Sequence, residues 1–392
     1  MKQWIYLPLL LLLLLIPARS SVEAIDSGEW SYTILDDGSA KITDYSGEEA
    51  NLVIPSSLDG HPVSVIGERV FSGSSLASVE IPEGVAAIGD EAFARCGSLT
   101  KVIFPESLVY ISDKAFVTTA LTSVTFPSHL KVIGKEAFSW CSYLSDITLP
   151  ASLNLIDEGA FYAAGLQYVE IPEGVTTIGG EAFGYSSTLT AISLPNSLTT
   201  IDGNPFDSSR SLETIKISAD HPVFEIVDGV LFNKKEHKLI AYPAGSAASF
   251  YAVPEGVTTI GLFAFSEAFN LTGISLPGSL TTIEAFAFSD TGLTAVEIPE
   301  GVTTIGYGAF IASDDLLSVS LPRSLTSIGA DIFAYSGISS VSVPAGSYAE
   351  TWAQQNNIPY SYYLVGQEIT EEEYNSGWQT LTGHEVYNGY LY

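Results

Sequence analysis

Basic residues are scarce in this chain of 392 residues, which holds 15 lysines and arginines against 45 aspartates and glutamates. The formal net charge of −30 opposes contact with nucleic acids and with anionic membranes, and it favours solubility. Motifs of common catalytic and phosphate-binding sites are also missing, including G-x-S-x-G, H-E-x-x-H, the Walker loop and G-x-G-x-x-G. We therefore expect no cofactor, no metal, no nucleic-acid partner and no enzymatic activity.

Long apolar runs are rare as well, and the clearest one, Ile5–Ile16, lies near the start of the chain. Lys2 precedes it and the small-residue site Val22-Glu23-Ala24 follows it, which is typical of a secretory signal peptide over residues 1–24. The alternative is an uncleaved membrane anchor, but this run is shorter than the ~20 apolar residues that span a bilayer. We expect a secreted or cell-surface protein with no membrane insertion after signal cleavage.

The chain consists largely of a repeated sequence segment. The segment IPEGVTTIG occurs at Ile171–Gly179 and at Ile298–Gly306, with close variants at Ile81–Gly89 and Val253–Gly261. Its proline recurs at an almost constant spacing, at Pro55, Pro82, Pro105, Pro127, Pro150, Pro172, Pro195, Pro254, Pro277, Pro299, Pro322 and Pro344. A fixed period of this size indicates a stacked-repeat protein, in which each unit buries its apolar side against its neighbours.

Apolar residues keep fixed places within each repeat. Residues around Val102 and Phe104 alternate in polarity before the next proline, which predicts one β-strand per repeat. An Ala-Phe pair such as Ala92-Phe93 recurs in the other half, and we interpret it as a short helical turn that places a column of phenylalanines in the core. The expected fold is an α/β-type repeat solenoid with one parallel strand per 22–23-residue repeat and short helical turns on the return leg.

These residues resemble the BspA-type repeat of the leucine-rich-repeat superfamily, found in bacterial and protozoan surface proteins. The shared pattern is P-x-x-[VL]-x-x-I-[GD]-x-x-A-F-x-x-[CS]-x-x-L-x-x-[VI]-x-[LIF]-P, and it covers about Val53 to Val343. The resemblance implies a curved, right-handed leucine-rich-repeat array with roles in adhesion and protein binding. It implies no catalytic residues, because the motif consists of core positions.

The two cysteines of the chain are expected to stay unpaired. Cys96 follows Pro82 at the same offset at which Cys141 follows Pro127, so they occupy the same site two repeats apart. Two strand spacings of ~4.8 Å separate them by more than the ~7 Å between Cα atoms that a disulfide tolerates. We interpret both as buried small residues.

The repeats suggest a division of the chain into four parts after the signal peptide. An N-terminal cap is expected over residues 25–58, the repeat solenoid over 59–346, a C-terminal cap with a short helix over 347–366, and an acidic and then aromatic tail over 367–392. A β-excursion at about 219–250 interrupts the repeat and concentrates Lys234, Lys235 and Lys238. This excursion is either a binding element or a structural joint between two arrays.

The candidate binding site lies on the exposed side of the strands, two and four positions before each proline. Most of these positions hold serine, threonine or alanine, whereas binding hot spots favour large aromatic and charged residues. Six of the exceptions form our candidate site, namely Tyr168, Glu170, Lys216, Phe250, Ile103 and Lys101. With Tyr168 and Phe250 on strands three steps apart, about 14 Å, one ligand is expected to contact both.

The function that these features favour is non-catalytic adhesion or binding by a monomer, with an extracellular protein or glycan as the partner. One alternative is a glycan-acting hydrolase that uses a pair of carboxylates on adjacent repeats. The other is a structural spacer that holds a partner elsewhere on the chain. A pocket with two carboxylates and an aromatic platform would favour the hydrolase, whereas a smooth, shallow sheet would contradict it.

Overall fold

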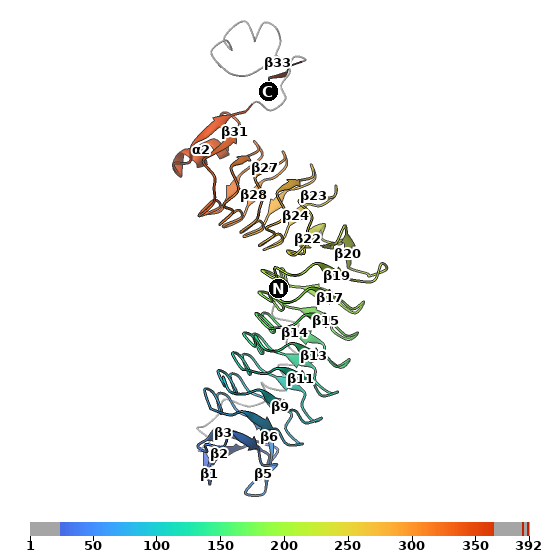
Figure 1. The fold of residues 1–392 in the computed structure, drawn as a ribbon, viewed down its shortest axis with the longest axis vertical. Coiled ribbons are helices and arrows are strands. Elements are labelled where there is room, and N and C mark those ends of the chain that lie inside the picture. Colours follow the sequence, from blue (N-terminus) through green and yellow to red (C-terminus); the bar gives the residue numbers. More distant parts are fainter. Residues whose placement is uncertain (1–23, 364–385, 388–389, 392) are drawn as a thin grey trace. The chain divides into compact units, whose positions relative to one another are not determined.

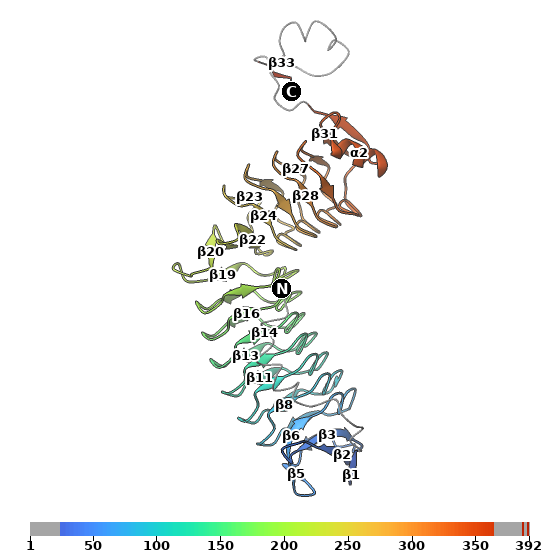
Figure 2. The ribbon, with the colours of Figure 1, turned by 180° about the vertical axis from the view of Figure 1, so that it is seen from behind.

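The computed structural model describes residues 24–363, 386–387 and 390–391, so the predicted signal peptide and most of the predicted tail lie outside the described residues. The chain divides into two units. Unit 1 comprises Met1–Leu166 and Gly174–Ile178, and unit 2 comprises Gln167–Glu173 and Gly179–Tyr392. In each unit, short strands follow one another in chain order (Figures 1 and 2). Within the described residues, no helix combines the length and apolar character needed to cross a bilayer.

Unit 1 begins with antiparallel strands and continues with parallel ones. The antiparallel strands are β1 (Ile25–Ser27), β2 (Trp30–Ile34) and β3 (Ala40–Tyr45), and β5 (Ser57–Leu58) pairs in the same sense with β6 (His61–Ile66). From β3 and β6 onward the pairing is parallel, through β8 (Ala87–Ile88), β10 (Tyr110–Ile111), β12 (Val132–Ile133), β14 (Leu155–Ile156) and β16 (Thr177–Ile178). These two-residue strands come from the V-x-x-I part of each repeat.

A second set of strands in unit 1 comes from the residues just before each proline. They are β4 (Asn51–Val53), β7 (Ser78–Glu80) and β9 (Lys101–Ile103) in one parallel sheet, and β11 (Ser123–Thr125) and β13 (Asp146–Thr148) in another. The predicted parallel strands are therefore confirmed, but each repeat contributes two strands, and the expected number of one per repeat was wrong. Proline ends the first strand because it has no N–H to donate, and the chain then extends again to pair with the next repeat.

Unit 2 repeats this arrangement on both sides of an antiparallel insertion. Strands before a proline position are β15 (Tyr168–Glu170), β17 (Ala191–Ser193) and β19 (Thr214–Lys216), then β23 (Phe250–Ala252) and β25 (Gly273–Ser275), then β27 (Ala295–Glu297), β29 (Ser318–Ser320), β31 (Ser340–Val343) and β32 (Tyr360–Tyr362). The two-residue strands are β18 (Thr200–Ile201), β24 (Thr259–Ile260), β26 (Thr282–Ile283), β28 (Thr304–Ile305) and β30 (Ser327–Ile328).

The insertion is the antiparallel set β20 (Phe224–Val227), β21 (Val230–Asn233) and β22 (Lys238–Ala241), and β22 then pairs in parallel with β24. Near the end of the array, helix α2 (Tyr348–Gln355) is capped at its N-terminus by Ser347, whose hydroxyl accepts the N–H of Glu350. The Glu350 carboxylate in turn accepts the N–H of Gly346, so two donors at the helix start are satisfied. Strands β33 (Val386–Tyr387) and β34 (Tyr390–Leu391) form a separate antiparallel pair.

The return leg of each repeat consists of turns, so the predicted helical turns were wrong. Glu91 and Arg95 flank the Ala92-Phe93 pair with φ of 54° and 59°, in the left-handed region that a right-handed helix excludes. The N–H groups of Glu91, Phe93 and Arg95 donate to carbonyls of the next repeat, at 2.9, 2.8 and 2.7 Å. In a helix these N–H groups would bond within their own segment. The return leg is therefore a third hydrogen-bonded face of the solenoid.

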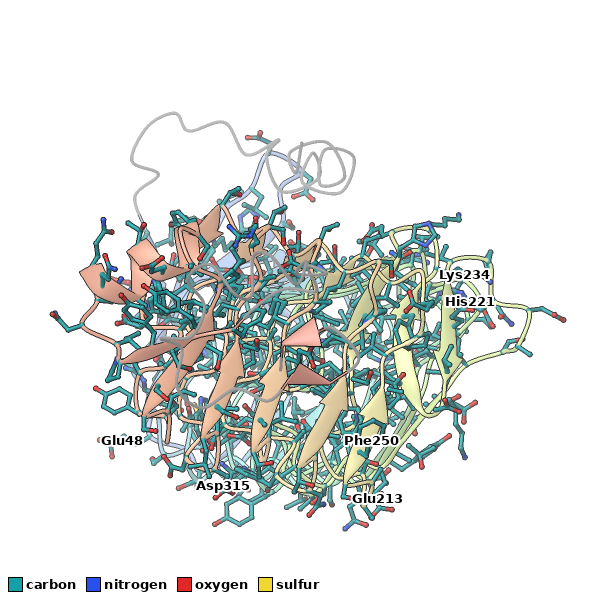
Figure 3. All side chains as sticks on the ribbon, turned by 90° about the horizontal axis from the view of Figure 1, so that it is seen from above. Glu48, Glu213, His221, Lys234, Phe250 and Asp315 are labelled. Atoms are coloured by element: carbon teal, nitrogen blue, oxygen red, sulfur yellow. The ribbon has the colours of Figure 1, made fainter. Side chains whose placement is uncertain are left out.

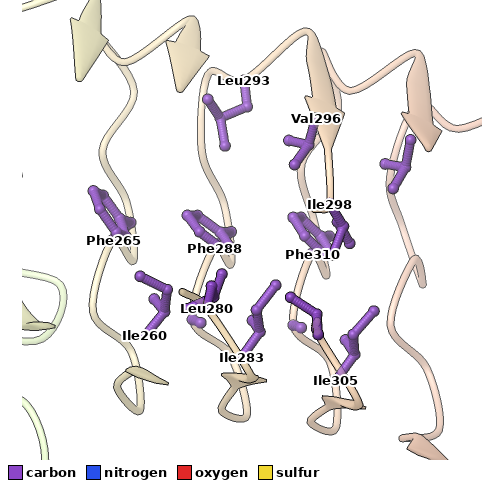
Figure 4. Packing of buried hydrophobic residues seen from close by; sticks show 14 of the residues in the cluster. Ile260, Phe265, Leu280, Ile283, Phe288, Leu293, Val296, Ile298, Ile305 and Phe310 are labelled. Carbon is purple, nitrogen blue, oxygen red and sulfur yellow. The ribbon is translucent and has the colours of Figure 1, made fainter. Parts of the chain in front are cut away.

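The predicted column of phenylalanines forms the core. Phe93 stacks on Phe116 with ring centroids 5.0 Å apart, and both are fully buried. In unit 2, Phe265, Phe288 and Phe310 stack in the same way at 5.0 and 5.2 Å, one ring per repeat (Figure 4). The ring spacing matches the ~4.8 Å between paired strands, because each ring follows the rise of its own repeat.

A side-chain network replaces part of the backbone ladder where the insertion interrupts unit 2. Arg210 donates from Nε and Nη2 to the two carboxylate oxygens of Glu267, at 2.5 and 2.9 Å, and Asn204 donates to the carbonyl of Phe263 at 2.8 Å. Beside them lies Asp207, which is 7% exposed and whose Oδ1 has no hydrogen-bond partner among the described residues. Burial raises the pKa of Asp207 to about 6.

Both cysteines are free and fully buried, as the spacing predicts. The thiols of Cys96 and Cys141 donate to the carbonyls of Phe71 and Phe116, one repeat earlier, and Ser209 and Ser313 make the same bond at their own repeats. Cysteine and serine thus have the same structural role, in which a small side chain donates a hydrogen bond to a carbonyl of the preceding repeat.

We expect both thiols to react with iodoacetamide only when the protein unfolds. Burial raises the pKa of the Cys141 thiol to about 11 and raises that of Cys96, so neither forms a thiolate at neutral pH. Mass spectrometry after alkylation with and without denaturant checks this expectation. Rapid labelling of the folded protein, or a Cys96–Cys141 bridge, would contradict the stacking of the repeats.

Candidate functional site

The strands that precede the prolines present alternate side chains to solvent, as extended strands do. In β9, β15, β19 and β23 the central residue is buried and the two flanking residues are exposed. The positions chosen from the sequence are therefore on the outside of the solenoid. What the structure adds is which of them share a sheet.

Tyr168, Glu170 and Lys216 come together in unit 2. Tyr168 and Glu170 lie on β15, and Lys216 lies on β19, with β17 between the two strands. Glu170, Ser193 and Lys216 are register partners, so the glutamate and the lysine lie two strand spacings apart, about 10 Å. Tyr168, half exposed at 50%, stands beside them and next to the small residue Ala191.

Phe250 does not belong to this group, and the prediction that its strand follows β19 directly was wrong. The sheet of β15 and β17 ends at β19, and Phe250 begins a separate sheet on β23. The ring is 58% exposed and lies across the neighbouring strand, where a Cβ added to Gly273 would be 3.2 Å from its Cδ2 atom. Figure 3 shows Phe250 on the same side of unit 2 as Glu213, with His221 and Lys234 on another side.

Ile103 and Lys101 form a third group, on β9 of unit 1. Ile103 is 43% exposed and its register partner on β7 is Glu80, while Lys101 pairs with Ser78. The six predicted residues are thus divided among three sheets. Tyr168, Glu170 and Lys216 are the largest set that the structure brings together.

Two of the three lysines of the β-excursion, Lys234 and Lys238, make structural contacts. The ammonium group of Lys234 donates to the carbonyl of His221 at 2.5 Å, and Lys238 bonds both carboxylate oxygens of Glu284 at 2.8 Å. His221 is fully buried, and its Nδ1 accepts the N–H groups of Val223 and Phe224, so the ring is neutral with its proton on Nε2. These contacts favour the joint over the binding element as the role of the excursion.

The glutamates of the repeated PEG motif hold successive turns together, a role that the sequence analysis missed. The Glu173 carboxylate accepts the backbone N–H groups of Asn196 and Ser197, one repeat later, at 2.9 and 3.0 Å. Glu83 and Glu300 bond the next turn in the same way. Hydrogen bonds from backbone amides lower the pKa of Glu173, so its carboxylate stays ionised. The alternation of P-E-G with P-x-S-L in neighbouring repeats was the signal that could have revealed it.

No two acidic residues are register partners on the strand face in the described part of the chain. The register partners of Glu80 are Val53 and Ile103, that of Glu170 is Ser193, and that of Glu297 is Ser320. No three His, Cys, Asp or Glu side chains among the described residues are grouped to hold a metal ion.

With this geometry described, the chain can be compared with known proteins. The family model for the BspA type leucine rich repeat region matches residues 64–188, 109–238 and 244–357, in six copies. The chain belongs to this family. No protein with a curated description matches it.

Solved structures show the same fold. A leucine rich cell surface protein from Faecalibacterium prausnitzii A2-165 is 26% identical with a TM-score of 0.63, over 88% of this chain and 100% of that one. The pneumococcal vaccine antigen PcpA is 21% identical with a TM-score of 0.63, over 88% and 100%. A leucine-rich repeat protein from Eubacterium ventriosum is 21% identical with a TM-score of 0.51, over 82% and 87%. The predicted family and the leucine-rich-repeat fold are confirmed.

Proposed function

We propose that this BspA-type protein is exported and binds an extracellular protein or glycan, without catalysis, through the outer face of β15, β17 and β19. The observation that carries the proposal is the grouping of Tyr168, Glu170 and Lys216 on that face. A half-exposed aromatic ring beside two opposite charges can supply apolar contact, a hydrogen-bond acceptor and a cation to one ligand.

Export to the cell surface is supported by two further observations. The similar protein of Faecalibacterium prausnitzii is described as a cell surface protein. The N-terminal sequence has the order of a signal peptide, with Lys2 before the apolar run and small residues after it. N-terminal sequencing of the protein recovered from cell fractions tests this part of the proposal, and a chain that retains Met1 in the cytoplasm contradicts it.

We expect Tyr168→Ala to weaken ligand binding by about thirtyfold, because an aromatic residue at a hot spot contributes roughly 2 kcal/mol or more. The measurement starts with a glycan array and a panel of purified extracellular-matrix proteins, followed by titration of each hit against the wild-type and variant proteins. Ser320→Ala, on another sheet, is the control and should leave affinity unchanged. Phe250→Ala tests the separate sheet of β23, and a loss there with none at Tyr168 would move the site.

A further inference from the structure

A strip of aromatic side chains lies on the return leg of unit 2, in the turns that follow strands β24, β26 and β28. Phe263 stacks on Phe286 with ring centroids 4.9 Å apart, and Tyr307 meets Phe286 edge to face at 5.2 Å. Phe263 and Phe286 are half-buried, and Tyr307 is 45% exposed. We call these three residues the aromatic strip. It differs from the buried column of Phe265, Phe288 and Phe310, which lies two positions after Phe263 and Phe286 and three after Tyr307.

The fold does not require aromatic residues at these positions, as unit 1 shows. Its corresponding residues, two before each core phenylalanine, are Arg69, Glu91, Lys114, Glu136 and Gly159, and the first four form the ion pairs Arg69–Glu91 at 2.9 Å and Lys114–Glu136 at 3.5 Å. The backbone is left-handed at all of these positions, and at Phe263 and Phe286 with φ of 54° and 55°. A bulky residue is disfavoured in this region, so local backbone preference does not explain the phenylalanines.

The turn that follows Phe286 accommodates its ring. Gly308 occupies the corresponding position there, and a Cβ added to it would lie 2.9 Å from Cε1 of Phe286. The ring therefore rests on a turn where only glycine leaves room for it, so that the strip continues from Phe286 to Tyr307. An apolar surface of this kind, built at a cost to the local backbone, points to contact with another molecule.

The surroundings of the strip are acidic. Lys238 and Arg210, the cations on this part of unit 2, are paired with Glu284 and Glu267. At the far end, the hydroxyl of Tyr307 bonds the carboxylate of Asp331, which raises the pKa of Tyr307. Asp331 takes part in none of the ion pairs of the described residues. The strip therefore lies in a negative field that favours a cationic partner.

We propose that the aromatic strip of Phe263, Phe286 and Tyr307 is a docking site for a partner protein segment that carries apolar side chains flanked by lysine or arginine. A second copy of this chain would bring like charges together, because the net charge is −30. A sugar ring stacks on aromatic faces, but the faces of Phe263 and Phe286 cover each other at an interplanar angle of 6°. The stacking covers one face of each ring, and apolar side chains fit against the exposed remainder of the strip.

The test uses two labelled amphipathic peptides that differ only in charge, one of leucine and lysine and one of leucine and glutamate. Fluorescence anisotropy measures their binding to the wild-type protein and to a double variant, Phe263→Lys with Phe286→Glu. This variant reproduces the Lys114–Glu136 pair of unit 1 and leaves the net charge unchanged. We expect the wild-type protein to bind the lysine peptide at least tenfold more tightly than the glutamate peptide, and the double variant to lose at least about tenfold of that affinity.

Matched controls keep the proposal open to refutation. Phe286→Gly, which suits the left-handed backbone, serves as a second variant should the double variant unfold in a thermal melt. Tyr168→Ala should bind the lysine peptide like the wild type, which separates this site from the sheet face proposed above. Unchanged affinity in the double variant, equal binding of both peptides, no binding by the wild type, or loss of binding in Tyr168→Ala would each overturn the proposal. A wild-type dimer that the double variant converts to a monomer would overturn it in favour of self-association.

Discussion

Replacement of Phe288 by alanine is expected to lower the free energy of unfolding by about 3–5 kcal/mol. The Phe288 side chain is fully buried and its ring contacts Phe265 and Phe310 at 5.0 and 5.2 Å, so the substitution leaves a cavity between two rings. The surrounding turns are held by hydrogen bonds between repeats, such as Phe288 N–H to the Ala309 carbonyl at 2.8 Å, and cannot collapse into the space. Denaturant unfolding followed by circular dichroism measures the change.

Phe286→Ala is the matched control, since it removes the same atoms from a half-buried place two positions earlier in the same turn. The expected loss there is about 1 kcal/mol or less, because the ring keeps much of its surface in water and the left-handed backbone already disfavours it. Similar losses for the two variants would show that the buried column and the aromatic strip are not distinct.

The second large effect is a gain of stability in Asp207→Asn, which develops between about pH 4 and pH 6 and is nearly complete at neutral pH. Burial, and to a smaller extent the charges of Glu181 and Glu267, raise the pKa of Asp207 from its ordinary value of 3.8 to about 6, while hydrogen bonds from Ser266 and Ser208 offset part of the shift. A shift of about two pKa units corresponds to roughly 3 kcal/mol between the two protonation states. At pH 8 the variant should therefore be more stable than the wild type by about 2–3 kcal/mol.

The direction of this pH dependence of stability follows from the number of protons that Asp207 binds in the folded and unfolded states. Between about pH 4 and pH 6 the folded protein holds a proton on Asp207 that the unfolded chain has lost, so wild-type stability falls as the pH rises through this range. Near pH 4 Asp207 is protonated in the folded state and partly protonated in the unfolded chain, and the variant should differ from the wild type in stability by less than about 1 kcal/mol.

Burial lowers the pKa of His221, which gives the opposite pH trend in stability, but this trend is the same in both proteins and cancels in the difference. A difference that is constant between pH 4 and pH 8 would contradict the buried carboxyl group. Asp314→Asn, at an exposed residue, is the control.

The two proposed binding surfaces depend on different residues. The face of β15, β17 and β19 depends on a few large residues among small ones, as Tyr168 and Lys216 illustrate. The aromatic strip depends on Phe263 and Phe286, which replace an ion-paired ladder at corresponding positions in unit 1. Because the variants at each surface serve as controls for the other, the experiments distinguish one binding site from two.

The period of the sequence predicted the repeats, the parallel strands, the buried phenylalanine column and the unpaired cysteines. A position that recurs once in every repeat meets its own equivalents in the stack, so apolar residues there are buried and Cys96 and Cys141 lie two repeats apart. This reasoning needs only the spacing, because neighbouring repeats are related by a fixed rise. It therefore holds for Phe93 as well as for Phe310, far along the chain.

The period could not reveal the conformation within a repeat. The sequence pattern around each Ala-Phe pair fits a helical turn and an open turn equally well. Which of the two conformations forms depends on the acceptors of the N–H groups of Glu91 and Arg95. Those acceptors are carbonyls on the next repeat, distant in sequence. The same holds for Glu173, whose carboxylate bonds the backbone of the following turn, and for the second strand of each repeat.

The sequence by itself thus determined the family, the repeat and the buried face of this protein, since these depend on composition and spacing. Only the tertiary structure decided which outward residues share a surface. It separated Phe250 from Tyr168 by ending a sheet at β19, and it joined Phe263, Phe286 and Tyr307 into one strip. The physical reason is that burial repeats with the period, whereas contacts on the surface depend on hydrogen bonds and ring packing between turns that no single repeat contains.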